Sequence, residues 1–259
     1  QQGEYVVAAD ERLAWLTGFT GSAGFAAVLP AAAGVFVDGR YTLQVRAQVA
    51  DVFTPVGWPE TKLGPWLVER LAEGDVVGFD PWLHTIKEVR DLRKVLEPKG
   101  ISLKPVDNLI DAIRDERPAR PQEPLRIHDL AVAGESHGEK RARLAKDLCD
   151  AGADAAVITL PDSLCWLLNV RGSDIPRNPL AQGFGILRDD GAVTYFTNAT
   201  ADDALRAHLG PDVTLAPYDG LSGALPDLSG KGLVDPDTAP EAARDLLRAE
   251  VVEGRDPCV

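Results

Sequence analysis

The feature that most constrains this chain is a ten-residue pattern that occurs twice. Its fixed positions are leucine, tryptophan, leucine, an apolar residue, glycine and serine, and the copies are 151 residues apart, from Trp15 to Trp166 and from Gly21 to Gly172. Each copy precedes two apolar runs with a glycine-bearing turn between them. Short apolar runs bounded by turns are typical of buried strands. The repeat therefore predicts one α/β domain present twice in tandem.

The second copy has the more complete pattern. Residues 139–149 place apolar side chains on one stripe and charges on the opposite face, which indicates an amphipathic helix, and Gly152 is suited to end it. Asp190-Gly191 favours a tight hairpin turn. The expected strands are 155–160, 184–187, 192–196 and 232–234, and the expected helices are 163–169, 202–208 and 240–250.

The first copy begins almost directly at the Trp15 pattern. It lacks a counterpart of the helix and strand that open the second copy, and we expect that this part has been lost. The chain starts at Gln1 and contains no methionine, which also indicates a fragment. The expected strands are 24–29, 35–37, 76–79 and 101–105, and the expected helices are 41–50, 63–71, 85–96 and 107–114.

Three prolines mark the expected domain boundary. Pro118, Pro121 and Pro124 lie among polar residues and cannot continue a helix or a sheet. We expect a first domain over 1–117, a proline-rich linker over 118–135 and a second domain over 136–254. Both halves interleave strands and helices, so each domain should be a mixed β-sheet flanked by helices, of the α/β class.

The composition excludes several classes of partner. A net charge of −13 argues against nucleic acid and anionic membranes, because both attract clustered Lys and Arg. The apolar stretches are far shorter than the roughly 20 residues of a membrane span. The three cysteines have no CxxC or Cys/His spacing, which predicts neither a disulfide framework nor a zinc site. A reducing cytoplasm suits such a chain.

No catalytic set is evident among the residues. Thr20-Gly21-Ser22 resembles a nucleophile elbow, but Thr20 occupies a place where that turn needs glycine. The glycines are interpreted instead as making a tight turn. The four histidines are scattered, and none has the spacing of a metal-binding pair. We therefore predict no catalytic residue and no metal ligand in this chain.

Two other groups of residues have both a structural and a functional interpretation. Trp15 and Trp166 are interpreted as core anchors that each bury a large ring, with ligand stacking as the alternative. Arg171, Asp174 and Arg177 lie in a polar, turn-rich segment. Such a loop either makes functional contacts or is held in place by an internal Arg/Asp pair.

The segment Asp38-Gly39-Arg40-Tyr41 is expected to join a strand to a helix. Asp38 is suited to cap the helix that begins near Tyr41, and Gly39 to turn the chain. We expect Arg40 to pair with an acidic neighbour, because arginine in a short turn often locks it. The alternative is that Arg40 projects towards a substrate.

Several stretches together resemble a known family. They occur in order along nearly the whole chain, at 12–24, 37–41, 78–82 and 166–179. They are similar to the two N-terminal domains, of the creatinase N-terminal type, of the three-domain Xaa-Pro aminopeptidases. The most specific part is 171–179. Arg114 and Gln182-Gly183 depart from the family pattern, but neither departure affects the chemistry.

The resemblance implies a peptidase whose chemistry lies outside this chain. In that family a C-terminal pita-bread domain holds two metal ions, manganese or zinc, and residues 255–259 resemble the start of the lead into it. The full-length enzyme would be a homodimer that removes the N-terminal residue from peptides with proline in second position. The present domains would bind no cofactor, gate access and support assembly. Arg40, Tyr41 and Arg171 are expected on the substrate approach.

Two alternatives remain beside the peptidase. The same N-terminal fold precedes inactive pita-bread domains in histone-chaperone subunits, where it is a protein-binding module. Prolidase and creatinase form the other alternative. These enzymes generally carry one such N-terminal domain, so the repeat in this chain counts against them.

Overall fold

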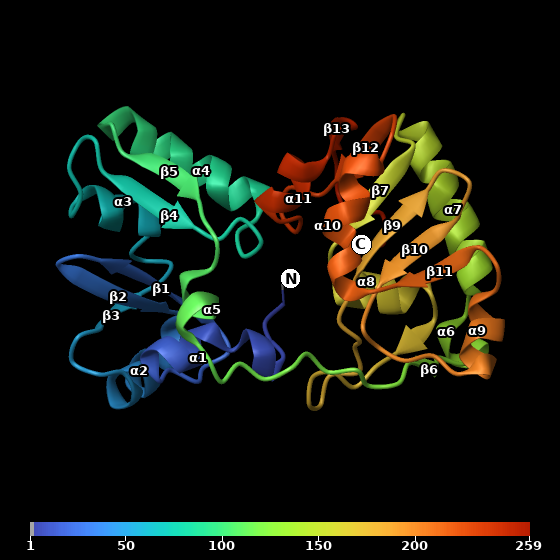
Figure 1. The fold of residues 1–259 in the computed structure, drawn as a ribbon, viewed down its shortest axis with the longest axis horizontal. Coiled ribbons are helices and arrows are strands. Elements are labelled where there is room, and N and C mark those ends of the chain that lie inside the picture. Colours follow the sequence, from blue (N-terminus) through green and yellow to red (C-terminus); the bar gives the residue numbers. More distant parts are fainter. Residues whose placement is uncertain (1–2) are drawn as a thin grey trace. The chain divides into compact units, whose positions relative to one another are not determined.

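The computed structural model describes residues 3–259, which divide into two compact units (Figure 1). We call Glu4–Asp80 with Arg90–Ala119 the N-terminal unit, and Pro81–Val89 with Arg120–Val259 the C-terminal unit. Both contain mixed strands and helices. This confirms the expected α/β class with two domains in tandem.

The C-terminal unit is built on a mixed sheet. Among the residues that the structure describes, six strands pair in the order β11-β10-β9-β7-β12-β13. The central strand β7 runs antiparallel to β9 and parallel to β12. Their bounds are β7 Ala155–Ile158, β9 Phe184–Arg188, β10 Val193–Phe196, β11 Val213–Ala216, β12 Lys231–Val234 and β13 Glu250–Glu253. A separate pair joins β6 Arg126–Ile127 to β8 Val170–Arg171.

Three helices of this unit begin after a residue whose side chain caps them, namely Asp129, Ser136 and Asp202. The longest one, α7, starts with a capping box in which Glu139 N donates to Ser136 Oγ (3.2 Å) and Ser136 N donates to Glu139 Oε2 (3.0 Å). Just past its end, Gly152 takes the left-handed conformation (φ 70°). The helices are α6 Leu130–Ala133, α7 His137–Asp150, α8 Pro161–Leu167, α9 Asp203–Leu209, α10 Leu221–Ala224 and α11 Glu241–Leu246.

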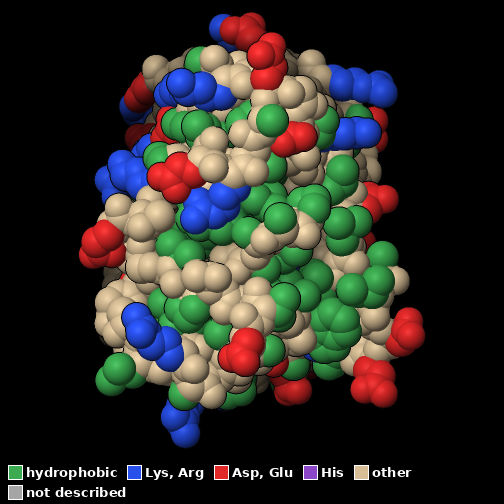
Figure 2. All heavy atoms as spheres, turned by 90° about the vertical axis from the view of Figure 1, so that its left-hand side faces the viewer, with side chains coloured by type: hydrophobic (Ala, Val, Ile, Leu, Met, Phe, Trp, Pro, Cys, Tyr) green, Lys and Arg blue, Asp and Glu red, His purple; other side chains and the backbone are tan. Residues whose placement is uncertain are grey.

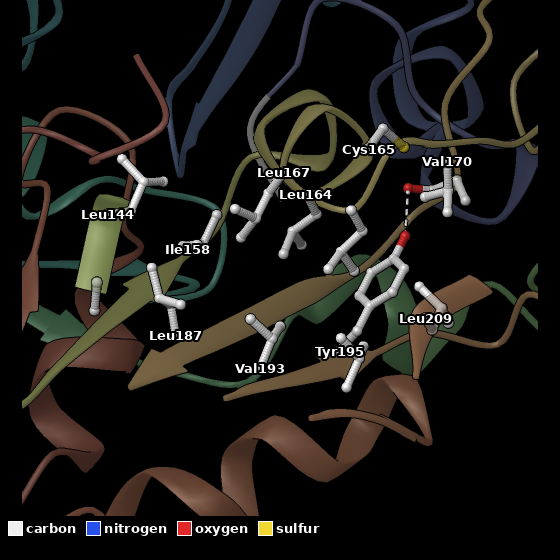
Figure 3. Close-up of a cluster of buried hydrophobic side chains, with 14 of the residues drawn as sticks. Leu144, Ile158, Leu164, Cys165, Leu167, Val170, Leu187, Val193, Tyr195 and Leu209 are labelled. Carbon is white, nitrogen blue, oxygen red and sulfur yellow. Dashed lines mark hydrogen bonds between the residues drawn. The ribbon is translucent and has the colours of Figure 1, made fainter. Parts of the chain in front are cut away.

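Both faces of the central strand are covered. Ala156 and Ile158 of β7 belong to one cluster of buried side chains, and Ala155 and Val157 belong to another. Figure 3 shows part of the first cluster, where Ile158 lies near side chains from α7 and β9. All four residues of β7 are buried, as expected for a strand packed on both sides.

The N-terminal unit has the same kinds of pairing but no continuous sheet. Within residues 4–80 and 90–119, β1, β2 and β3 form one sheet in that order, and β4 and β5 form another. β1 is antiparallel to β2, whereas β2–β3 and β4–β5 are parallel. The bounds are β1 Gly24–Leu29, β2 Ala32–Val37, β3 Thr54–Gly57, β4 Val76–Phe79 and β5 Ser102–Pro105.

The core of the N-terminal unit is smaller and partly open. Phe36 and Leu67 are almost fully buried, but Val28 on β1 is 61% exposed. The helices are α1 Arg12–Thr17, α2 Thr42–Gln48, α3 Leu63–Val68 and α5 Leu109–Ile113. Short 3-10 turns occur at Ala8–Asp10, Gly39–Tyr41 and Glu97–Lys99 here, and at Tyr218–Gly220 and Leu225–Asp227 in the other unit.

The segment Pro81–Val89 interrupts the N-terminal unit in sequence but belongs to the C-terminal unit by its contacts. Ile86 is fully buried in a core cluster of the C-terminal unit, and its N–H donates to the carbonyl of Ala239 (3.0 Å). The ring centroid of Trp82 lies 6.2 Å from the ring centroid of Phe184. α4, Ile86–Leu96, therefore starts in one unit and ends in the other.

Most predicted elements are present, but some boundaries are wrong. The helix predicted at 240–250 ends at Leu246, because residues 250–253 extend to form β13 beside β12. Strands β3 and β11 were not predicted, although they pair in parallel with β2 and β10. The segment predicted as a linker, 118–135, contains β6 and α6. Along residues 3–259, no helix is both long and apolar enough to span a membrane.

Candidate functional site

A polar turn follows β2 in the N-terminal unit. Asp38 Oδ1 accepts a hydrogen bond from Arg40 N (2.9 Å) and so caps the 3-10 turn that leads into α2, which confirms the predicted cap. A Cβ added at Gly39 would meet no atom within 4 Å, and Gly39 is not in the left-handed region. Gly39 opens the turn into α2, as predicted, although its conformation does not require a glycine.

Arg40 joins this turn to a second segment of the same unit. Its guanidinium pairs with Asp38 (2.7 Å) and Glu4 (3.1 Å), so the expected internal pair is present. These bonds lower the pKa of Asp38 and raise that of Arg40. The Arg40 side chain is nonetheless 59% exposed, so it stays accessible while being held in one orientation.

Ser22 and Tyr41 complete the cluster. The hydroxyl of Ser22 donates to Glu4 Oε1 (2.8 Å) and shares a hydrogen bond with the Tyr41 hydroxyl (2.7 Å). The bond from Ser22, followed by that from Arg40, lowers the pKa of Glu4. We call Glu4, Ser22, Asp38, Arg40 and Tyr41 the turn cluster. It contains two carboxylates, a guanidinium and two hydroxyls at the surface, which suits recognition of a polar or charged ligand.

The turn cluster lacks the parts of a serine nucleophile. All four histidines of the chain lie in the C-terminal unit, so no imidazole of the N-terminal unit can activate Ser22. Glu4 is the acidic group that contacts Ser22, and its lowered pKa makes it a poor base. The cluster is suited to binding rather than to bond cleavage.

The Arg171 loop of the C-terminal unit is held by backbone contacts. Arg171 Nη1 donates to the carbonyls of Val170 (2.8 Å) and Cys165 (3.3 Å). Asp174 is 8% exposed and accepts from Gln182 N (2.7 Å), while burial raises its pKa. Arg171 and Asp174 therefore do not pair with each other in this loop, and each is bonded separately to the backbone.

The repeated glycines lie in crowded positions, as their turn role requires. A Cβ on Gly172 would lie 2.5 Å from Ala181 N, and one on Gly21 would lie 2.2 Å from the Phe19 ring.

The repeated tryptophans are less alike. Trp15 is 43% exposed, so its prediction as a core anchor is wrong. Trp166 is partly buried, with the buried Lys140 ammonium 4.3 Å from its ring centroid.

Three histidines that are distant in sequence line one cavity. His128, His137 and His208 border a space of about 520 Å³ in the C-terminal unit. His137 Nε2 donates to the carbonyl of His208 (2.7 Å), and the centroids of the two imidazole rings are 4.8 Å apart. Burial lowers the pKa of His137. No local spacing signalled this grouping, because the residues come from separate elements.

The described residues do not form a metal centre. Over residues 3–259, no group of three His, Cys, Asp or Glu side chains is placed to hold a metal ion. Cys165 is buried, which raises the pKa of its thiol to about 11 and keeps it from acting as a thiolate nucleophile. Residues 3–259 therefore do not fit a dinuclear metal site.

The predicted site residues fall into two groups. Arg40 and Tyr41 are adjacent members of the turn cluster in the N-terminal unit, and the Arg40 guanidinium lies 5.2 Å from the Tyr41 ring centroid. Arg171 lies on β8 in the C-terminal unit. The sequence did not single out Glu4, and it brought up Ser22 only as a possible nucleophile; the fold brings both to Arg40 and Tyr41.

Comparison with known families decides the assignment. The family model of the creatinase/prolidase N-terminal domain matches residues 4–115, and a second model of the same description matches residues 116–259. The chain belongs to this family. It carries two creatinase-type domains in tandem, which confirms the resemblance seen in the sequence.

Curated proteins that are similar to this chain include aminopeptidases. The chain is 37% identical over 238 residues to a probable Xaa-Pro aminopeptidase P of Coccidioides posadasii, covering 88% of this chain and 38% of that protein. It is 34% identical to aminopeptidase P2 of Arabidopsis thaliana, covering 92% of this chain and 35% of the relative. The creatinase-type pair thus spans less than two fifths of the length of these relatives.

A solved structure shares the fold over nearly the whole chain. It is the X-prolyl aminopeptidase of Caenorhabditis elegans, described as a cytosolic enzyme with a di-nuclear active site. The TM-score is 0.90 at 29% identity, over 98% of this chain and 44% of that one.

Proposed function

We propose that this chain is the N-terminal, non-catalytic region of a metal-dependent Xaa-Pro aminopeptidase. The full-length enzyme removes the N-terminal residue from peptides that have proline in second position. The observation that supports this proposal is the match of both creatinase-type domains, along 88% and 92% of the chain, to proteins named as aminopeptidases P. The C. elegans enzyme supports a cytoplasmic location.

Bond cleavage belongs to a part of the enzyme outside these residues. The full-length protein would bind two metal ions, manganese or zinc, which supply an activated water and polarise the scissile carbonyl. The described residues offer no ligand set for such ions. The creatinase-type domains would instead select substrates by limiting access, and they would support assembly of a homodimer.

The turn cluster is suited to selection of short peptides by charge. A free peptide amine is a cation and a peptide C-terminus is an anion, and Glu4 and Arg40 present the complementary charges at the surface of one unit. We propose that Arg40 and Tyr41 lie on the substrate approach. Arg171, in the C-terminal unit, is proposed separately as a substrate-approach residue. The 59% exposure of the Arg40 side chain leaves it available for this role.

The proposal that residues 1–259 do not catalyse cleavage themselves is tested by comparing the full-length enzyme with the purified chain 1–259. With added Mn²⁺, the full-length protein should release the N-terminal residue of an Xaa-Pro tripeptide, and the chain alone should release none. Metal-dependent turnover by the chain alone would contradict the non-catalytic role. An inactive full-length protein with a bound metal would contradict the peptidase assignment itself.

The substrate-approach role is tested in the full-length enzyme. Arg40→Ala and Arg171→Ala should raise KM for a tripeptide while changing kcat little, because they would affect entry rather than chemistry. Arg46→Ala, at an exposed position of α2, is the matched control. If Arg40→Ala behaves like Arg46→Ala in KM, Arg40 has only its structural role in the turn. Substitutions that change kcat alone would also rule out the approach role.

A further inference from the structure

The space bordered by His128, His137 and His208, which we call the histidine cavity, lies within the C-terminal unit. Its walls come from β6 with the start of α6, from the start of α7, from Asn169 and from α9. About 520 Å³ is enough room for a small organic molecule. The N-terminal unit contains no histidine, and none is visible on the face of the molecule in Figure 2. The imidazoles of this chain are therefore concentrated at one cavity.

The walls of the histidine cavity are held by hydrogen bonds within the protein. The N–H of His128 donates to the carbonyl of Asn169 (2.8 Å), and Asn169 itself has the left-handed conformation (φ 51°). The Asn169 amide donates to the Glu135 carbonyl (2.8 Å) and accepts from the buried Lys140 ammonium (2.7 Å). A site whose groups are already fixed loses less conformational entropy when a ligand binds.

Several polar groups of the wall are already used inside the protein. Ser136 Oγ donates to Glu139 Oε2 and accepts from Glu139 N in the capping box. Both the oxygen and the nitrogen of the Asn169 amide are bonded. His137 Nε2 donates to the His208 carbonyl, and His137 Nδ1 is buried. These groups are therefore not available to a ligand.

The polar groups that remain are hydrogen-bond acceptors. His208 Nε2 lies 3.0 Å from the Leu168 carbonyl oxygen, which can only accept, so Nε2 carries the proton and Nδ1 of the neutral ring has the lone pair. Asp129 caps α6 through Oδ1, which accepts from Ala131 N (2.8 Å), and Oδ2 has no partner among the residues described. The His128 imidazole also has no hydrogen-bond partner within residues 3–259. Its unprotonated nitrogen can therefore accept from a ligand.

The rest of the wall is partly apolar, and its charge is negative. Ile127 and Leu130 line the cavity and are 47% and 54% exposed. Asp129 supplies a carboxylate to the wall. The buried ammonium of Lys140 is not part of the wall, and it donates to the carbonyl of Trp166 (2.9 Å). A ligand that fits has hydrogen-bond donors, a positive charge and an apolar group.

We propose that the histidine cavity binds a small primary ammonium compound that carries an apolar group. The ammonium donates to Asp129 Oδ2, to His208 Nδ1 and to the His128 imidazole, and the apolar group lies against Ile127 and Leu130. Three acceptors match the three N–H bonds of a primary ammonium, and the carboxylate compensates its charge. An anionic ligand would instead face a carboxylate and two lone pairs. This inference is independent of the proposed peptidase function, because the cavity shares no residue with the substrate approach.

The test measures binding of isoamylamine to the chain 1–259 by calorimetry at pH 8, where an ordinary imidazole is neutral. Isoamylamine should bind, and isocaproate, which has the same apolar group but an anionic end, should not. Asp129→Asn should weaken binding of isoamylamine at least about fivefold, because it removes the charge while asparagine still caps α6. Asp227→Asn, at an exposed position of the same unit, is the matched control and should leave the affinity unchanged.

Nuclear magnetic resonance supplies the second measurement. The imidazole signals of His128 and His208 should shift when isoamylamine is added, whereas those of His84, which does not line the cavity, should not. Equal binding of isoamylamine and isocaproate would overturn the proposal. An unchanged affinity in Asp129→Asn, or equal shifts at all three histidines, would overturn it as well.

L-Leucinamide distinguishes two sources of the ammonium group, because it places the same apolar side chain beside an amide. Binding as tight as that of isoamylamine would identify the N-terminus of a peptide as the ligand. Binding of isoamylamine alone would identify a free amine.

Discussion

The N-terminal and C-terminal units share a pattern of strand pairing but differ in how much of it is buried. In the C-terminal unit the sheet is continuous and its central strand is covered on both faces. In the N-terminal unit the corresponding strands form two sheets. Val28 on β1 is at the surface, whereas Leu187, at the same register position of β9, is core. The comparison shows that a strand's burial is set by its neighbours rather than by its own sequence.

The largest expected effect is on the core position that differs between the units. Leu187→Ala should destabilise the C-terminal unit by about 2–5 kcal/mol, because it leaves a cavity in the buried cluster that Leu187 shares with Leu144 and Leu148 of α7. Val28→Ala in the chain 1–259 should change the unfolding free energy by less than about 0.5 kcal/mol, as for other surface changes. Denaturant unfolding of both variants measures the difference. A similar loss of unfolding free energy in both variants would show that Val28 is packed against other side chains in the N-terminal unit and is not a surface residue.

A smaller effect is expected at the repeated glycine of the C-terminal unit. Gly172→Ala would place its methyl group 2.5 Å from the backbone nitrogen of Ala181, and the resulting shift should cost about 1–3 kcal/mol. Gly39→Ala in the N-terminal unit is the control, because a Cβ there meets nothing within 4 Å. Thermal unfolding distinguishes them. A well-tolerated alanine at 172 would mean that the Arg171 loop is not held as described.

The two units should differ in how their folding stability changes as the pH falls. Burial lowers the folded-state pKa of His137 below 6.5, so the unfolded chain takes up a proton first as the pH falls. Stability of the C-terminal unit is therefore lost from about pH 6.5 down to the folded pKa. The N-terminal unit has no histidine and should not respond in this range.

The variant His137→Gln isolates this contribution. It should flatten the pH dependence of unfolding of the C-terminal unit, whereas His84→Gln, at a partly exposed site, should leave the dependence in place. Melting curves between pH 5 and 7 give the readout. An unchanged slope in His137→Gln would assign the acid response to other groups.

The smallest effect is expected in the turn cluster. Arg40→Ala removes ion pairs to Asp38 and Glu4, but Arg40 and Glu4 are solvent-exposed, and such surface pairs contribute little to stability. The melting temperature should fall by less than in Gly172→Ala, and the fall should shrink further at high salt. A large, salt-independent loss would show that Arg40 is a structural anchor of the N-terminal unit.

Several parts of the fold were predictable because their signals are local. The α7 helix is specified by its apolar stripe, by the capping box at Ser136 and by Gly152 after its end. The Asp38 cap and the hairpin turn at Asp190-Gly191 are also encoded within a few residues. The constant offset of 151 residues indicated the tandem arrangement that the two family matches confirm.

Other parts could not be predicted from local signals. The short strands β3 and β13 carry no long apolar run, and they are strands because β2 and β12 offer them partners. Trp15 and Trp166 occupy the same place in the repeat, yet Trp15 is 43% exposed, whereas Lys140 of α7 lies over Trp166. The turn cluster and the histidine cavity each gather residues from separate segments.

The sequence by itself determined the fold class, the duplication and the family, because apolar periodicity, caps, turns and motif spacing are written in neighbouring residues. Only the tertiary structure decided which equivalent positions are buried, that Glu4 and Ser22 join Arg40 and Tyr41, and that Pro81–Val89 packs in the C-terminal unit. The physical reason is that burial and side-chain pairing depend on which elements, distant in sequence, pack against a given surface. A local sequence pattern does not specify these long-range contacts.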